Sequence, residues 1–260
     1  MIAKHLPKRR RSRPGSGQWL RRGALDSWTG VLASESPTRL AIIAYQKGPR
    51  SRKPDFAVTA LPSKSKLRAL NPITHFLAGW AVANLSDLGK RERTVVVLAG
   101  IVPDIDAAGL VAEMLTRNSN HPLYWWSEYH HVLAHNAGFG IVVAGTAFAL
   151  ARQRGKTALL ATLSFHLHLL GDLIGARGPG GEQWPIPYLL PFSNGWQLTW
   201  SGQWPLNGWP NMVLTALLIG ATCRWAWRRG FSPLEMLSAR ADQVFVEALR
   251  RRWPLPSAPV

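Results

Sequence analysis

Apolar residues gather in five segments of the later part of the chain, at about 72–87, 94–102, 137–151, 157–174 and 211–227. Little in this region alternates between apolar and polar residues with period two, so strands are not expected. Several segments run about 15–17 residues, which is short for a membrane span and long for an ordinary amphipathic helix. Their polar faces are thin and consist mostly of His and Asp. The pattern predicts an all-α fold, a multi-helix membrane-embedded bundle.

The flanks of this region differ from it. Residues 1–70 have no sustained apolar period and hold 16 Lys/Arg against 3 Asp/Glu. Such a composition predicts a basic, disordered N-terminal extension. Residues 71–230 form the predicted helical domain. Ser232, Pro233 and Glu235 are typical of a helix start, so residues 231–260 are predicted to hold a C-terminal amphipathic helix, which either lies on a membrane surface or docks on the bundle.

Basic residues follow the first, third and fifth apolar segments. If the segments span a membrane in alternation, these clusters share one side, which the positive-inside rule makes cytoplasmic. The opposite side then receives the loops at 103–136 and 175–210. The basic extension enters from that outer side, against the rule, so buried core helices of a soluble protein remain an alternative. The prediction is a multi-pass membrane protein.

Cysteine and tryptophan contents narrow the chemistry. The single cysteine, Cys223, excludes a disulfide framework and a cysteine-rich metal site. Five of the 13 tryptophans fall in a long loop, 184–209, that is also rich in Pro and Gly. Tryptophan concentrates at membrane interfaces and at the rims of binding clefts. Because the net charge of +17 comes mainly from the extension, nucleic acid is not the expected partner of the helical part.

Asp104, Asp106 and Asp172 lie within or at the ends of apolar segments. A charged Asp in the middle of a bilayer costs roughly 2.5–3.5 kcal/mol, and little Lys or Arg is nearby in the sequence to pair with these three. A bound cation would neutralise the acids and coordinate neutral imidazoles at the same time. The sequence therefore predicts a metal site.

The histidine spacing supports that prediction. His168 and Asp172 share a helix face, and Asp104 and Asp106 lie two residues apart at the proline break that Pro103 makes. The predicted metal ligands are His75, Asp104, Asp106, His130, His135, His168 and Asp172. Asp104 and Asp106 are also the predicted catalytic carboxylates. The residues predicted to surround the ligands without binding the metal themselves are His131, His166 and Glu182. Imidazoles and carboxylates without thiolates suit Zn, or Mn or Fe, and seven ligands exceed the four of one zinc, so two or more ions are expected.

The order of these motifs resembles that of the YdjM-like family of bacterial inner-membrane, metal-dependent hydrolases. The resemblance runs over about 71–230. It rests on Thr74-His75 with Gly79, on Pro103-Asp104-Ile105-Asp106, on His130 with His135, and on His168 with Asp172. The family's third motif usually reads His-Arg-Gly-x-Thr-His-Ser, and residues 130–136 keep only its two histidines. More distantly, the helical His/Asp arrangement is similar to that of the zinc phospholipase C and P1 nuclease group.

This resemblance implies a membrane-bound hydrolase that activates water at a divalent metal site. The expected substrate is a small-molecule or lipid phosphoester, and membrane lipid is the expected partner. Two other functions stay open on the sequence alone. One is a non-catalytic, metal-binding membrane protein, such as a transporter or a scaffold. The other is a nucleic-acid-associated protein that acts through its basic extension.

Overall fold

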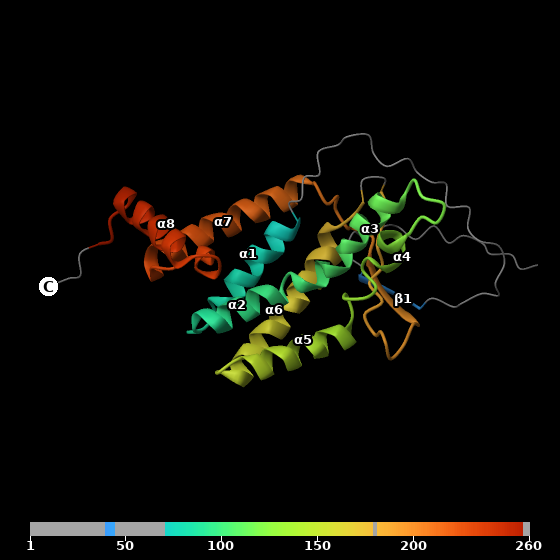
Figure 1. Cartoon of the computed structure of the whole chain (residues 1–260), viewed down its shortest axis with the longest axis horizontal. Coiled ribbons are helices and arrows are strands. Elements are labelled where there is room, and N and C mark those ends of the chain that lie inside the picture. Colours follow the sequence, from blue (N-terminus) through green and yellow to red (C-terminus); the bar gives the residue numbers. More distant parts are fainter. Residues whose placement is uncertain (1–39, 45–70, 179–180, 257–260) are drawn as a thin grey trace, which may run out of the picture. The chain divides into compact units, whose positions relative to one another are not determined.

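The computed structural model describes residues 40–44, 71–178 and 181–256 of the chain (Figure 1). The predicted disorder of the N-terminal extension lies outside the described residues, apart from one strand at 40–44. Within the described residues, most of the chain is helical, and helices account for every apolar segment. The all-α prediction is therefore confirmed in its coarse form.

The five apolar segments correspond to five helices. They are α1 (Asn71–Ala83), α2 (Lys90–Ala99), α5 (Ala137–Leu150), α6 (Arg154–Gly175) and α7 (Trp209–Arg229). Helix α6 packs against α1, α2 and α5, and α7 packs against α1. The core of the bundle includes Trp80, Phe165 and Ile186, which are almost fully buried. Helix α6 is thus the central helix, and its buried face can present side chains to several neighbours.

Glycines let the central helices approach closely. A Cβ on Gly79 of α1 would lie 3.2 Å from the backbone of Val97 in α2 and 3.0 Å from Ser164 Oγ in α6. At this crossing the absence of a side chain is what permits the contact between α1 and α2. The packing of α1 on α2 therefore depends on this glycine.

The long segment between α2 and α5 is more structured than predicted. It contains the 3-10 helix η1 (Val102–Ala108) and the short helices α3 (Gly109–Thr116) and α4 (Trp125–Tyr129). The Trp-rich loop contains strand β2 (Trp196–Trp200), which pairs antiparallel with β1 (Leu40–Ala44). The expectation that strands are absent was wrong for this pair. The two strands are far apart in the sequence, so no local pattern could predict that they pair.

The C-terminal helix is shorter than predicted and has two parts. Ser232 caps the 3-10 helix η2 (Pro233–Met236), and Ser238 caps α8 (Ala239–Arg252). The break arises because the Ser232 backbone N–H and hydroxyl both donate to the Asp242 carboxylate, which folds η2 back onto α8. The prediction of a single helix from Phe231 was therefore wrong at its start, although the Ser232 cap is confirmed.

Within the described residues, one helix, α6, is long and apolar enough to cross a membrane, and a second span results if α2 and the following η1 and α3 count together despite their 52° bend. The outer faces of α5, α6 and α7 also expose large apolar side chains, among them Ile141, Phe148, Leu159, Leu163, Val213 and Leu217. Contiguous exposed apolar surface marks a membrane or protein interface. The number of spans stays a prediction.

Candidate metal centre

One end of the bundle gathers buried histidines and aspartates from separate elements. Asp104 lies on η1, His135 in the turn before α5, and His168 and Asp172 on α6. Each offers one nitrogen or oxygen atom, and these atoms all lie within 4.8 Å of one another. We call these four residues the His/Asp cluster. Residues separated by 68 positions in the sequence are thus brought to one point by the packing of η1, α5 and α6.

The closest distances within the cluster meet at Asp172. His135 Nε2 and His168 Nε2 both lie 3.1 Å from Asp172 Oδ2, and the two nitrogens are 3.2 Å apart. Asp104 Oδ1 lies 3.6 Å from His168 Nε2. Four ligands about 2.1 Å from a tetrahedral ion would be ~3.4 Å from one another. The cluster therefore already has the spacing of a metal site.

Two neighbouring groups fix the tautomers of these histidines. His168 Nδ1 lies 2.8 Å from the Gly100 carbonyl oxygen, which only accepts, so Nδ1 carries the proton and donates. His135 Nδ1 likewise donates to Asp106 Oδ2 at 3.1 Å. In neutral rings both Nε2 atoms then bear lone pairs, which point at each other and at the Asp172 carboxylate. Three acceptor atoms so close together repel one another unless a positive charge lies between them. That charge can be a metal ion or an additional proton.

Burial strengthens that requirement. His135, His168 and Asp172 are each at most 1% exposed, so water does not screen the cluster. Asp104 is partly exposed, yet its Oδ2 is buried and accepts no hydrogen bond. An orphaned buried carboxylate oxygen is rare in folded proteins and calls for a bound ion or water. The donor set of two imidazoles and two carboxylates fits a divalent cation such as Zn.

Asp106 contacts the histidines from behind. Its Oδ1 accepts from His130 Nδ1 at 2.9 Å, and its Oδ2 accepts from His135 Nδ1 and from the His131 backbone N–H. Both oxygens are thereby engaged, and Asp106 is not in the group of four. A carboxylate that holds the far nitrogen of a ligating histidine is the usual outer partner in metal sites. The structure gives Asp106 this orienting position, and its role as a metal ligand stays a prediction.

His131 lies inside the same site. It adopts a left-handed backbone with φ of 65°, which is strained for a residue with a side chain and which turns its N–H toward Asp106. Its Nε2 lies 3.8 Å from Asp172 Oδ2, and its Nδ1 is buried without a hydrogen-bond partner. Burial lowers the pKa of His131 to about 3, so the ring is neutral near pH 7.

His135 has the opposite electrostatics in the metal-free chain. Burial lowers its pKa, but hydrogen bonds to Asp106 and Asp172 and the charges of both carboxylates outweigh burial and raise the pKa to about 9. The ring is therefore protonated near pH 7 when no metal is bound. A proton then occupies the position between the acceptors that a metal ion would take.

His75 and His130 flank the cluster on two sides. His75 Nε2 lies 3.2 Å from Asp172 Oδ1, and its ring centroid is 3.9 Å from that of His168. Gly171 admits this ring, because a Cβ there would lie 2.8 Å from His75 Cε1. His130 stacks on Trp126 with ring centroids 3.7 Å apart. His75 and His130 thus lie beside the four residues of the His/Asp cluster, and Asp106 contacts His130 and His135 at the same site.

The other two predicted outer residues have different surroundings. His166 hydrogen-bonds the Thr162 carbonyl and the Tyr188 hydroxyl, which use both ring nitrogens. Glu182 is exposed in the turn after Gly178. Both ring nitrogens of His166 are thus engaged by groups outside the cluster, and the role of Glu182 stays a prediction.

Three groups contribute to the site without having been identified from the sequence. The Gly100 carbonyl orients His168, and the edge of Trp184 packs against His130 and His131 with centroids 5.3 and 5.2 Å away. Gln203 Nε2 donates to the Asp172 backbone carbonyl at 2.7 Å. A signal existed only for Trp184, which belongs to the Trp-rich loop. A carbonyl and a single amide leave no pattern in a sequence.

Comparison with known proteins gives one match. The family model described as YdjM inner membrane protein matches residues 70–246, a range that contains the whole His/Asp cluster and the helices that hold it. No curated protein and no solved structure matches the chain. The more distant similarity to the zinc phospholipase C and P1 nuclease group stays a prediction.

Proposed function

Because the chain belongs to the family described as YdjM inner membrane protein, we propose that its His/Asp cluster is the metal centre of a membrane-bound hydrolase. The observation that carries the proposal is the meeting of His135 Nε2, His168 Nε2 and Asp172 Oδ2, three acceptors about 3 Å apart in a buried place. Asp104 completes the set from the more exposed side. The proposed ion is Zn, with Mn or Fe as alternatives.

A second ion is part of the proposal. His75 on Asp172 Oδ1, and His131 near Asp172 Oδ2, offer further imidazoles beside the same carboxylate. His131 is neutral near pH 7, as ligation requires, because burial lowers its pKa. Together with His130, the imidazoles of His75 and His131 supply ligand atoms beyond the four that one zinc ion needs.

The residues around the cluster have separate tasks in hydrolysis. A bound divalent ion supplies Lewis acidity, which polarises the scissile ester and makes water more acidic. Asp104 is the proposed general base, because its unpartnered Oδ2 can accept a proton and its side chain reaches the exposed side. Asp106 holds His130 and His135 in place, and the aromatic rings of Trp126 and Trp184 cover the histidines on one side.

The proposed substrate class is a phosphoester, either a lipid headgroup or a small molecule. The partly exposed Asp104 and the indoles beside His130 support a substrate that approaches from the Trp-rich side. The proposed setting is the periplasmic side of the bacterial inner membrane, because most of the exposed basic residues in the described part of the helical domain lie at the other end of the bundle. This setting makes a membrane lipid accessible to the site.

The test measures metal content and hydrolysis together in the full chain, purified in detergent. Elemental analysis of the native protein is compared with His168→Ala and with the matched control His166→Ala, which alters the same helix two residues away. We expect Zn or Mn in the native and control proteins. The His168→Ala variant should contain little or no metal, because removal of a ligand lowers metal affinity by more than the roughly 100-fold that changes to outer partners produce.

Hydrolysis is then assayed with bis(p-nitrophenyl) phosphate, p-nitrophenyl phosphate and p-nitrophenyl acetate. Phosphoester cleavage by the native and His166→Ala proteins, absent in His168→Ala, would support the proposal. A protein that binds metal but cleaves none of these compounds would instead be a metal-binding transporter or scaffold. A native protein without bound metal under non-chelating conditions would remove both interpretations.

A further inference from the structure

Helix α8 is fixed to the end of α7 by its inward face. Asp242 accepts from the Ser232 N–H and hydroxyl, and Arg250 Nε donates to the Trp227 carbonyl at 3.0 Å. Trp227 Nε1 in turn donates to the Trp253 carbonyl. Val246 is buried on the same face. The orientation of α8 is therefore set by specific contacts, and its opposite face is held outward.

That outward face carries an apolar stripe between arginines. Val244 is 61% exposed, and Leu237, just before the helix, is 86% exposed. At 100° per residue, Ala241, Val244 and Ala248 form one stripe on α8, with Arg240 and Arg251 along one edge and Arg252 along the other. The stripe borders a shallow hollow lined by Ser238, Arg240, Ala241, Val244, Phe245 and Ala248. Trp253 follows the helix and is 58% exposed.

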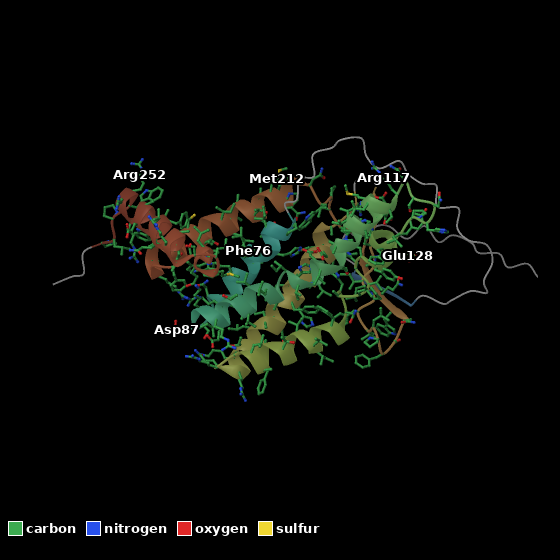
Figure 2. The ribbon with its side chains drawn as sticks, in the orientation of Figure 1. Phe76, Asp87, Arg117, Glu128, Met212 and Arg252 are labelled. Atoms are coloured by element: carbon green, nitrogen blue, oxygen red, sulfur yellow. The ribbon has the colours of Figure 1, made fainter. Side chains whose placement is uncertain are left out.

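The position of α8 in the bundle matches this composition. Hydrogen bonds from Arg229 to Asn84 and from Gln153 to the Asp87 carbonyl join the turns after α1 and α5 to the end of α7. We call this region, with its exposed basic residues, the basic end; they are Lys90, Arg91, Arg152, Arg154, Lys156, Arg224, Arg228 and Arg229. Figure 2 shows Asp87 and Arg252 toward this end and Arg117 and Glu128 toward the other.

We propose that the outward face of α8 lies on an anionic phospholipid surface, with its apolar stripe at the boundary of headgroups and acyl chains. Arginine at the stripe's edges would contact lipid phosphates, and Trp253 would anchor the end of the helix at the interface. Among the acids near this face, Glu235 pairs with Arg93 and Asp242 is buried against Ser232, while Glu247 is exposed and pairs with Arg251. The charge argument for this face therefore rests mainly on Arg240 and Arg252. The inference does not depend on the metal centre.

A depth measurement on the full chain tests the proposal. With Cys223→Ala as background, a fluorophore is placed on Val244→Cys or on the matched control Gln243→Cys, an exposed polar neighbour one helical step away. The protein is reconstituted in nanodiscs of phosphatidylcholine with or without phosphatidylglycerol. In anionic discs we expect the Val244 label to be quenched by nitroxide lipids and shielded from acrylamide, and the Gln243 label to stay open to acrylamide.

The arginines provide the second arm of the test. Each basic residue near an anionic surface contributes about fivefold to binding, so Arg240→Gln, Arg251→Gln and Arg252→Gln together should lower the ratio of immersed to free helix on the order of a hundredfold. Val244→Asn should lower it without removing charge. All four side chains are exposed, and an unchanged thermal midpoint in detergent verifies the fold.

Two results would overturn the proposal. One is a Val244 label as open to acrylamide in anionic discs as the Gln243 label. The other is shielding of Val244 that grows with protein concentration in detergent alone, because a second copy of the chain would then cover this face.

Discussion

Both ends of the bundle bury acids, but the acids face different partners. At the basic end, Glu235 forms a two-pronged pair with Arg93 at 2.7 and 2.8 Å, and Glu92 accepts the Arg152 backbone N–H. At the other end, Asp172 faces His75, His135 and His168, of which at least two present lone pairs in their neutral forms. At the basic end the buried carboxylates accept hydrogen bonds from N–H donors. At the other end the Asp172 carboxylate faces ring nitrogens that are themselves potential acceptors.

This difference separates acids that the fold itself satisfies from acids that need a cation. A buried carboxylate with donors stabilises the fold without any addition. A buried carboxylate among imidazoles needs a cation, so its site is complete only when a proton or metal ion is present. The contrast leads to three predictions in which the two ends respond to different perturbations.

The largest effect is expected at the basic end. Glu235→Ala leaves Arg93 largely buried without its carboxylate partner, and we expect the free energy of unfolding to fall by about 3 kcal/mol. Metal content, measured by elemental analysis, should not change. The control is Glu247→Ala, which breaks an exposed pair with Arg251 and should change stability by about 1 kcal/mol or less. Loss of bound metal in Glu235→Ala would show that the two ends are not independent.

A smaller effect is expected from Asp106→Asn. The amide keeps the shape of the side chain but offers one acceptor oxygen to three donors, so His135 loses its defined tautomer. Metal affinity should fall by about 10–100-fold with unchanged stoichiometry, as titration with a competing chelator would measure. Glu92→Gln at the basic end is the control and should leave the affinity as it is. Complete loss of one ion would instead make Asp106 a ligand, as the sequence predicted.

The smallest effect concerns pH. In the metal-free chain the pKa of His135 is raised from 6.5 to about 9, so its protonated ring stabilises the fold fully below pH 6.5, and that contribution is lost as the pH rises through 9. His131 acts in the opposite direction and mainly at lower pH, because its lowered pKa costs stability only where the ring of the unfolded chain is protonated, and this cost fades as the pH rises through 6.5. The thermal midpoint of the metal-free protein, followed by tryptophan fluorescence, should therefore decline between pH 6.5 and 9.

Metal should remove this dependence. A ligating His135 is neutral, so the metal-loaded protein should hold its midpoint over the same interval and release about one proton per ion on loading near pH 7. His135→Gln should flatten the profile of the metal-free protein. An equal decline in both metal-free proteins would assign the titration to another group.

The sequence predicted the helices well, because their signal is local. Each of the five apolar segments became one helix, and Ser232 acts as the cap that its spacing indicated. Pairing of β1 with β2 escaped prediction because Leu40 and Trp200 meet only in the folded chain. Helices α3 and α4 were not predicted because they have only eight and five residues, too few for a helical spacing of apolar residues to stand out.

The candidate site was predictable in its membership but not in its arrangement. Residue type and spacing brought His135, His168 and Asp172 forward as a group. The sequence does not show whether Asp104 or Asp106 faces the His/Asp cluster. The two lie two residues apart, and the bend of η1 decides how each side chain is oriented. The Gly100 carbonyl and the Gln203 amide act through positions that only the packing of distant segments creates.

Gly171 extends this lesson to a residue with no chemistry of its own. The ring of His75 occupies the volume that a side chain at position 171 would need, so the two exclude each other. In a chain with alanine or leucine at position 171, the His75 imidazole would have to move away from Asp172, even though the sequence still contained every candidate ligand. The number of imidazoles beside Asp172, and with it the proposed choice between one ion and two, therefore depends on the absence of a side chain at position 171.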